Sequence, residues 1–145
     1  MSKDSDYSFS MPEAVTATRV PDEERLHFLP DVFGDLLMLR GEALVYGWLR
    51  QLCAEYSGGF WQFYRLSNGG FYLAPERTDR LRLTVAGNYF DGVMSADAAG
   101  IVATLFALGQ LAGETREERF IDAYHQLRAY ACGHDEAASI FAAID

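Results

Sequence analysis

The most informative pattern of hydrophobic positions in this chain surrounds a single Asn-Gly pair. Two aromatic-rich runs, residues 60–66 and 71–75, flank Asn68 and Gly69. Asn-Gly between such runs is the strongest short-range signal for a β-hairpin with a two-residue type I′ turn, because both central residues of that turn need positive φ. We therefore predict a hairpin whose turn consists of Asn68 and Gly69.

The predicted turn also decides which side chains share a face of the hairpin. It places Leu66 opposite Phe71, and the two faces follow from the two-residue period of a strand. One face carries Phe60, Tyr64, Leu66, Phe71 and Leu73. The other carries Trp61, Phe63, Arg65, Tyr72 and Ala74. Neither face is plainly polar, so the hairpin is either covered on both sides or presents an aromatic, basic surface.

Apolar residues at helical spacing predict two helices before the hairpin. A short helix begins at Pro21 and ends before Pro30, because proline disfavours helical geometry at the residue that precedes it. A longer helix covers about residues 42–56, where an apolar stripe repeats every three to four residues. The glycines of Ser57-Gly58-Gly59 end this second helix, since glycine accepts a left-handed C-terminal cap.

Three further helices are predicted after the hairpin. Ser95 caps a helix that is apolar almost all round as far as Leu111, and its small residues allow close backbone approach. It should be the buried central helix, too short for a membrane span, which needs about 20 apolar residues. Thr115 and Glu118 form a capping box that opens the next helix. A last short helix begins at Asp135.

These elements predict an α+β fold in a single domain. Leu81, Leu83 and Val85 alternate with polar residues and read as a third strand, which would extend the hairpin into a short antiparallel meander packed with helices. A length of 145 residues fits one domain. Residues 1–18 have no hydrophobic period and are expected to be a flexible segment, so the folded domain is expected to cover residues 19–145.

The charge of the chain is acidic and unevenly distributed. The net charge is −9; residues 1–24 hold six acids against two bases, and residues 91–145 hold nine against three. An acidic protein binds nucleic acid poorly, because cations supply most of that affinity. Such a charge either attracts a basic, DNA-handling partner or merely keeps the protein soluble. With no signal peptide and only two cysteines, the chain is expected to be cytoplasmic and not bound to a membrane.

No catalytic apparatus is visible in the sequence. None of His27, His125 and His134 belongs to a recognisable set of metal or catalytic ligands on one helical face. Cys53 lies on the apolar stripe of a predicted helix, where a small buried thiol is more typical than a nucleophile. Recognised hydrolase, metalloprotease and phosphate-loop motifs do not occur. We therefore predict a protein that is not an enzyme, with no catalytic residue, metal or cofactor.

Four ordered segments resemble the ArdB/KlcA antirestriction proteins, which are small proteins of plasmids and other mobile elements. They are Val20-Pro21-Asp22-Glu23-x-Arg25-Leu26, the hairpin from Gly58-Gly59-Phe60-Trp61 to Ala74-Pro75-Glu76, Met94-Ser95-Ala96-x-Ala98-Ala99-Gly100-Ile101, and Leu127-Arg128-x-Tyr130-Ala131. The resemblance covers about residues 17–145. It implies that the protein alleviates DNA cleavage by type I restriction–modification systems when a mobile element enters a host. It further implies a non-enzymatic mechanism through the restriction complex or a host factor.

Two charged clusters and an aromatic face are the candidate partner-binding residues. They are Asp22, Glu23 and Glu24, the basic strand residues Arg65, Arg80 and Arg82, and the hairpin residues Trp61 and Tyr72. The main alternative function is a nucleic-acid-binding module that stacks bases on the Trp61, Arg65 and Tyr72 face. Mimicry of DNA by carboxylates needs a denser acidic run than this chain has, and a small hydrolase is a more distant alternative.

Overall fold

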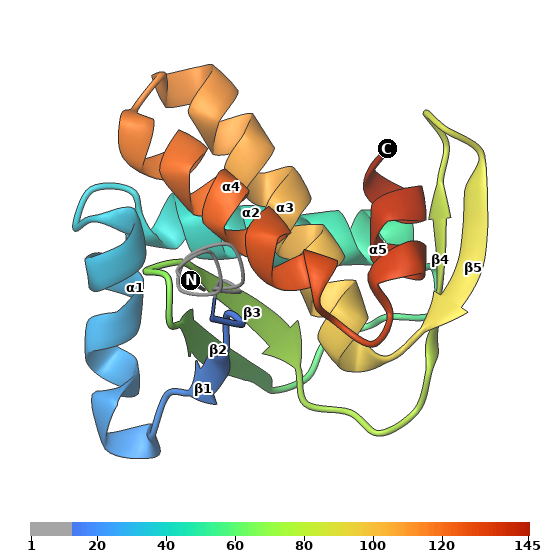
Figure 1. The fold of residues 1–145 in the computed structure, drawn as a ribbon, viewed down its shortest axis with the longest axis horizontal. Coiled ribbons are helices and arrows are strands. Elements are labelled where there is room, and N and C mark those ends of the chain that lie inside the picture. The colour runs from blue at the N-terminus through green and yellow to red at the C-terminus, as the bar shows by residue number, and fades with distance from the viewer. Residues whose placement is uncertain (1–12) are drawn as a thin grey trace, which may run out of the picture.

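The computed structural model describes residues 13–145 as two small antiparallel sheets with helices packed around one long central helix (Figure 1). The elements are β1 (Ala17–Arg19), the 3-10 turn η2 (Asp22–Glu24), α1 (Arg25–Phe33), α2 (Met38–Leu52), β2 (Trp61–Leu66), β3 (Phe71–Pro75), β4 (Leu81–Val85), β5 (Phe90–Met94), α3 (Ala96–Thr115), α4 (Glu118–Cys132) and α5 (Ala137–Ile144). β1, β2 and β3 form one sheet in that order, and β4 pairs with β5 in the other. The expected α+β class is confirmed.

The single meander predicted from the sequence is in fact divided between these two sheets. β4 does not extend the hairpin, because α3 covers the free edge of β3. There the hydroxyl of Thr104 accepts a hydrogen bond from the N–H of Leu73 (3.2 Å) and donates one to its C=O (3.3 Å), as a neighbouring strand would. Gly100 lies so close to Ala74 that a Cβ atom on Gly100 would collide with the strand. The predicted close approach is thereby confirmed, and β4 pairs with β5 instead.

The hairpin of β2 and β3 is confirmed, but its turn is one residue longer than predicted. The N–H of Leu66 donates to the C=O of Gly70 (2.8 Å), so residues 67–69 form a three-residue loop. Gly69 has a φ of 94°, whereas Asn68 keeps a negative φ, which rules out the type I′ turn. The loop is clamped by α4, since Gln126 accepts a bond from the Asn68 amide and donates one to the Asn68 carbonyl.

The longer turn shifts the pairing of the two strands by one residue. Tyr64 lies opposite Tyr72, and Arg65 lies opposite Phe71. Because neighbouring residues of a strand point to opposite faces, this shift moves Tyr72 away from the face that carries Trp61 and Arg65. The predicted grouping of Trp61, Arg65 and Tyr72 on one face was therefore wrong.

Tertiary packing also overrides the predicted end of the first helix. α1 continues through Pro30 and ends at Phe33. Its buried Phe28 stacks on Phe63 with ring centroids 4.7 Å apart, and Phe33 meets Phe71 edge to face at 5.3 Å. Burying two aromatic side chains outweighs the one backbone hydrogen bond that proline cannot donate.

The boundaries of two other helices differ from the predictions. α2 covers residues 38–52, about four residues earlier than expected. Thr115 ends α3 rather than opening α4, because its hydroxyl donates back to the C=O of Leu111 (2.8 Å). α4 then begins at Glu118 without a side-chain cap. The predicted capping box was wrong, since its threonine serves the preceding helix.

The central helix α3 is confirmed as the core of the domain. The Ser95 hydroxyl accepts from the N–H of Ala98 (3.1 Å), as expected of a helix cap. α3 has 20 residues and is long and apolar enough to cross a membrane, so the argument from its length was wrong. However, 67% of its most apolar window is buried by the surrounding elements, which is typical of a core helix.

The expected flexible segment overlaps the first strand. Residues 1–12 lie outside the described part of the chain. Ala17 and Thr18, which were assigned to that segment, instead pair with Leu66 and Arg65 of β2. The Ser67 side chain also accepts a hydrogen bond from the N–H of Thr16 (2.9 Å). The ordered domain therefore begins before residue 19.

Candidate functional site

The three acidic residues predicted to meet a partner lie together on the surface. Asp22, Glu23 and Glu24 form the exposed turn η2 at the start of α1. Within residues 13–145 the ion pair recorded for this acidic cluster joins Asp22 to Arg19 at 3.9 Å. Glu23 and Glu24 therefore project their charges into solvent, near the positive end of the α1 dipole.

Trp61 and Tyr72 are core residues rather than surface contacts. Their exposed fractions are 3% and 1%. The indole N–H of Trp61 donates to the hydroxyl of Tyr56 (2.5 Å), and the ring of Tyr72 stacks on Tyr64 with centroids 4.7 Å apart. Neither ring is free to stack on a base. The aromatic, basic face that the nucleic-acid alternative requires is thus absent from the described surface of the hairpin.

The three predicted basic residues do not form one surface. Arg65 belongs to β2, whereas Arg80 and Arg82 lie on or beside β4 of the other sheet. Each of them contacts a carboxylate: Arg65 with Asp31 at 3.0 Å, Arg80 with Glu136 at 3.5 Å, and Arg82 with Asp91 at 2.5 Å. The guanidinium of Arg82 lowers the pKa of the Asp91 carboxyl. These arginines are neutralised locally.

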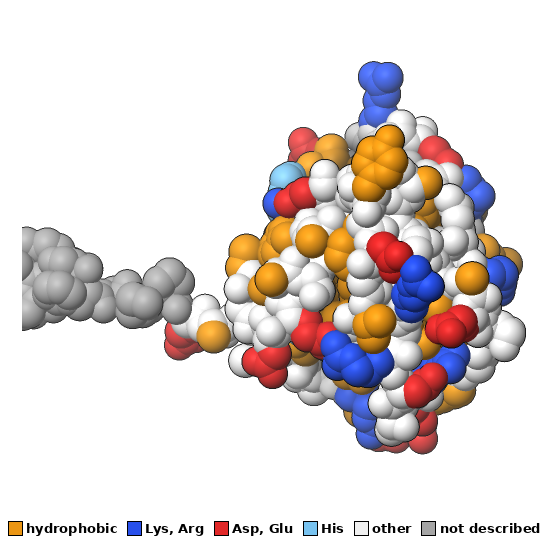
Figure 2. All heavy atoms as spheres, turned by 90° about the vertical axis from the view of Figure 1, so that its right-hand side faces the viewer, with side chains coloured by type: hydrophobic (Ala, Val, Ile, Leu, Met, Phe, Trp, Pro, Cys, Tyr) orange, Lys and Arg blue, Asp and Glu red, His pale blue; other side chains and the backbone are white. Residues whose placement is uncertain are grey.

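Pairing of this kind extends over most of the surface. Of the eleven arginines in residues 13–145, eight lie within 4.0 Å of a carboxylate oxygen. Figure 2 shows the result on the face formed by α5, β4 and β5, where acidic and basic side chains are interspersed. Since phosphate binding depends on uncompensated cations, this surface does not favour nucleic acid.

A half-buried polar network joins the start of α3 to the turn between α4 and α5, and sequence analysis missed it. Nε2 of His134 lies 2.8 Å from one carboxylate oxygen of Asp97, and the hydroxyl of Tyr72 donates to the other oxygen at 2.7 Å. Nδ1 of His134 accepts from the N–H of Glu136 (2.9 Å). Spacing along the chain could not reveal these contacts, because 37 residues separate Asp97 from His134.

The protonation of Tyr72 and His134 suits a structural role for this network. Burial and the Asp97 carboxylate raise the pKa of Tyr72 above its usual value of 10, so the phenol keeps its proton and donates it. The bond to Asp97 raises the pKa of His134 above 6.5, although burial opposes this. Both ring nitrogens of His134 are occupied, so neither is available to take a proton from a substrate in this arrangement.

Other residue types that perform catalysis are dispersed. Cys53 is fully buried, and Cys132 is exposed. Among the residues that the structure describes, no group of three or more His, Cys, Asp or Glu side chains is arranged to hold a metal ion.

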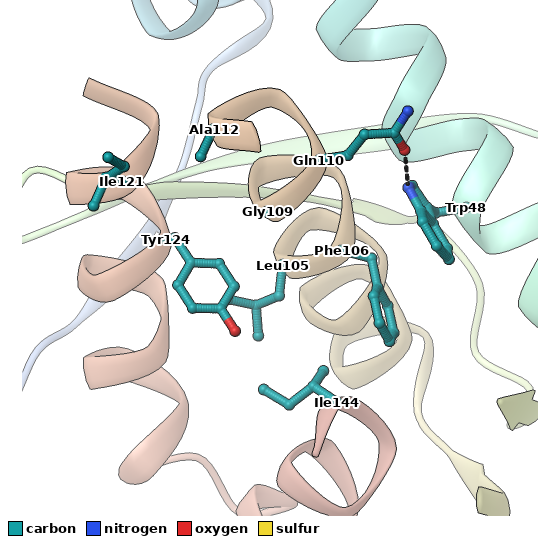
Figure 3. Close-up of a pocket in the computed structure, with 9 residues that line it drawn as sticks. All are labelled: Trp48, Leu105, Phe106, Gly109, Gln110, Ala112, Ile121, Tyr124 and Ile144. Atoms are coloured by element: carbon teal, nitrogen blue, oxygen red, sulfur yellow. Dashed lines mark hydrogen bonds between the residues drawn. The ribbon is translucent and has the colours of Figure 1, made fainter. Parts of the chain in front are cut away.

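An apolar groove lies along α3 (Figure 3). Its volume is about 440 Å³. The groove residues come from α2, α3, α4 and α5, and are Trp48, Leu105, Phe106, Gly109, Gln110, Ala112, Ile121, Tyr124 and Ile144. None of them is charged, and the polar groups are the Gln110 amide, the Tyr124 hydroxyl and the Trp48 indole N–H. The groove can therefore receive apolar side chains.

One wall of the groove is fixed by a chain of contacts. Trp48 stacks on Phe106 with ring centroids 4.7 Å apart and planes 15° apart. The indole N–H of Trp48 donates to the Gln110 carbonyl oxygen (3.0 Å), and the Gln110 amide donates to Glu114 (2.8 Å). The guanidinium of Arg40 contacts the Glu114 carboxylate at 2.6 Å. These contacts hold this wall of the groove in place. Sequence analysis missed the groove because its residues come from four helices.

Comparison with known proteins places this chain among antirestriction proteins. A family model described as antirestriction protein matches residues 54–145. The chain is 60% identical over 141 residues to antirestriction protein KlcA of Escherichia coli, covering 93% of this chain and 97% of that protein. It is 39% identical to the putative antirestriction protein YubI of Escherichia coli strain K12, over 87% of this chain and 93% of that one.

A solved structure agrees with these relatives in fold. It superposes with a TM-score of 0.87 at 56% sequence identity, covering 94% of this chain and 99% of the other. That structure belongs to work on the KlcA and ArdB proteins, for which a novel fold is described, together with antirestriction activity against type I DNA restriction systems in vivo but not in vitro. The chain described here belongs to the antirestriction protein family.

Proposed function

We propose that this protein protects incoming DNA from cleavage by type I restriction systems, and that it does so by binding rather than by catalysis. The observation that carries the proposal is the agreement of sequence and fold with KlcA over nearly the whole chain. Such similarity extends through the core, the hairpin and the central helix. In the cytoplasm of a host, this activity would help a plasmid or another mobile element to become established.

The conditions under which the structural relatives act support a partner found in the cell. Their activity is described as present in vivo and absent in vitro. An enzyme that altered the restriction complex or the DNA alone would be expected to work with purified components. A protein that acts through an additional cellular component would not be expected to work with those purified components alone. We propose that this chain binds either the restriction complex in its cellular state or a host factor that cooperates with it.

The electrostatics of the surface favour a basic partner. The net charge is −9, and most described arginines already contact carboxylates. Complementary charge raises the rate of encounter and selects partners. The acidic cluster of Asp22, Glu23 and Glu24 is the predicted contact whose charges remain most exposed. Among the basic residues, Arg80 and Arg82 would contribute to binding only by exchanging their present carboxylate partners.

Direct binding of nucleic acid is the weaker proposal. Trp61 and Tyr72 are buried, and Arg65 contacts Asp31. A gel-shift titration of purified protein against duplex and single-stranded DNA at low and moderate salt separates the two functions. We expect no salt-sensitive shift. A specific complex whose affinity falls steeply with salt would instead favour the nucleic-acid function.

Plating efficiency measures the proposed function itself. Unmodified phage is plated on isogenic hosts with and without a type I system, each carrying this gene or an empty vector. We expect protection in the type I host and no effect in the host without the system. Equal plating with the gene and with the empty vector in the type I host would contradict the proposal.

A further inference from the structure

Glycines inside the helices divide into two groups. Glycine destabilises a helix interior relative to alanine, so we asked whether a Cβ atom would fit at each glycine inside a helix. Gly41 of α2 and Gly100 of α3 have an internal reason, because a Cβ atom would strike Phe33 at the first and Ala74 at the second. Both of these positions allow elements of the fold to approach each other closely.

The remaining glycines of α2 and α3 have no such reason within the fold. A Cβ atom on Gly47 or Gly113 would meet no atom within 4 Å, and on Gly109 it would meet only Tyr124, at 3.9 Å. Gly109 lines the apolar groove, and Gly113 follows it by one helical turn. Gly47 lines a smaller hollow of about 230 Å³ that shares Trp48 and Gln110 with the groove. Gly47 and Gly109 therefore border the same region, and Gly113 lies one helical turn beyond Gly109.

Contacts within the fold hold the walls of this region in place. Trp48 is held by its stacking on Phe106 and its hydrogen bond to Gln110. The opposite wall carries Tyr124 and Ile121, whose side chain is 41% exposed (Figure 3). A preformed apolar groove with aromatic walls and an open backbone along its floor is suited to close contact with another chain.

We propose that this groove binds one face of an α-helix that belongs to a basic protein partner. This inference rests on the proposed function, which requires a partner, and it names the surface and the chemistry of the contact. Apolar side chains of the partner helix would enter between Trp48 and Tyr124. The partner backbone would pass close over Gly109 and Gly113, where the absence of Cβ atoms leaves room.

The polarity of the groove favours a helix over an extended segment. Its lining offers three polar side-chain groups, on Trp48, Gln110 and Tyr124, and the first two are already bonded to each other. An extended strand would leave its backbone N–H and C=O groups without partners there. A helix satisfies its own backbone and presents only side chains.

Charge favours a partner helix flanked by lysine or arginine. The helices α3, α4 and α5, with the turns between them, carry eight acidic residues against three arginines from Ala96 to Asp145. Glu118 is exposed and lies one turn before Ile121 at one end of the groove. Glu114 and Asp145 lie near the two ends as well, but they already contact Arg40 and Arg128. The groove itself holds no cation, so a phosphate backbone would find no counter-charge.

Filling the groove tests the proposal in the cell. Gly109→Leu adds a side chain whose Cβ atom would meet only Tyr124, at 3.9 Å, and leucine is a better helix former than glycine, so we expect the melting temperature not to fall. Ala129→Leu adds the same side chain at an exposed position on the solvent face of α4. We expect Gly109→Leu to lower restriction alleviation by roughly tenfold or more and Ala129→Leu to keep it.

A second pair of variants guards against an effect of misfolding. Ile121→Lys places a cation at the rim of the groove, and Leu36→Lys makes the same change at a leucine that is 97% exposed elsewhere. Only the rim variant should lose alleviation. If a folded Gly109→Leu or Ile121→Lys protein protects like wild type, the groove is not the contact surface. Failure of wild-type protein to protect would instead overturn the proposed function itself.

A designed peptide tests the chemistry directly. Two amphipathic helical peptides share a leucine face, and one carries lysine while the other carries glutamate beside it. Trp48 lines the groove and the other tryptophan is buried, so tryptophan emission reports binding. We expect the lysine peptide to change the emission of wild type and not of Gly109→Leu. Equal binding of the glutamate peptide, or equal binding to Gly109→Leu, would overturn the proposal, as would failure of the lysine peptide to bind.

Discussion

The imidazole of His134 and the carboxylate of Asp97 lie 2.8 Å apart, although 37 residues separate them in the chain. This contact ties the turn between α4 and α5 to the N-terminal end of α3. Tyr72 of β3 donates to the same carboxylate, so the three-stranded sheet is joined to the helices at one point. Through Asp97, these contacts join α3, β3 and the turn between α4 and α5.

Stability should depend on pH through this pair. The Asp97 bond raises the pKa of His134 above 6.5, so its contribution is fully present below pH 6.5 and is lost as pH rises through the raised pKa. Asp135 and Glu136 face the same ring and act in the same direction. We expect the difference in melting temperature between wild type and His134→Gln to be larger at pH 6 than at pH 9. A difference that grows with pH would contradict this assignment.

The Thr104 hydroxyl should be worth more to stability than its size suggests. Replacing it with the isosteric valine leaves the N–H and C=O of Leu73 buried without partners at the edge of β3. We expect Thr104→Val to lower the free energy of unfolding by about 1–3 kcal/mol. Thr104→Ser is the matched control, since it keeps the hydroxyl and removes only a methyl group. Chemical denaturation of both variants measures the effect, and equal stability of Thr104→Val and wild type would refute the edge contact.

The hairpin loop should tolerate no β-branched residue at its left-handed position. Gly69 has a φ of 94°, which side chains rarely adopt. We expect Gly69→Val to destabilise the protein by about 1–2 kcal/mol. Asn68 has a negative φ, so Asn68→Ala loses only its bonds to Gln126 and Gly70 and serves as a contrasting variant. Thermal melting of Gly69→Val at the wild-type temperature would show that the loop is misassigned.

Reversing the acidic cluster should weaken function without weakening the fold. Asp22, Glu23 and Glu24 are exposed, and exposed charges contribute little to stability. If they attract a basic partner, changing all three to lysine should reduce restriction alleviation partially, since rim charges act mainly on the rate of association. Glu55 is exposed elsewhere, so the single reversals Glu23→Lys and Glu55→Lys compare the cluster with another site at the same change of net charge. Melting curves should remain alike, and unchanged plating efficiency would place the partner surface elsewhere.

Local patterns predicted the elements of this fold better than their pairing. The hairpin, the Ser95 cap and the buried central helix follow from turn chemistry and hydrophobicity, and all are present. The errors arose where distant residues intervene. Gln126 of α4 binds the hairpin loop, whose strands are shifted by one residue from the predicted register. Thr104 of α3 binds the edge of β3 that β4 was expected to join.

The candidate functional residues were likewise predicted best where they are neighbours in the sequence. The exposed acidic cluster was visible in the sequence because its three residues are consecutive. The sequence left open whether Trp61 and Tyr72 lie on the surface, because the pattern of a strand does not reveal whether helices cover both of its faces. The apolar groove was not predicted, because Trp48, Phe106 and Tyr124 come from three different helices and meet only in the folded chain.

The central claim is protection by stoichiometric binding, and a dose titration in the cell tests it most directly. The number of copies of this protein per cell is varied with an inducible promoter, and plating of unmodified phage on a type I host is measured against that number. The account predicts that protection rises in proportion to the copy number and saturates once copies match those of the limiting target. Full protection at copy numbers far below the target would show turnover and contradict the account.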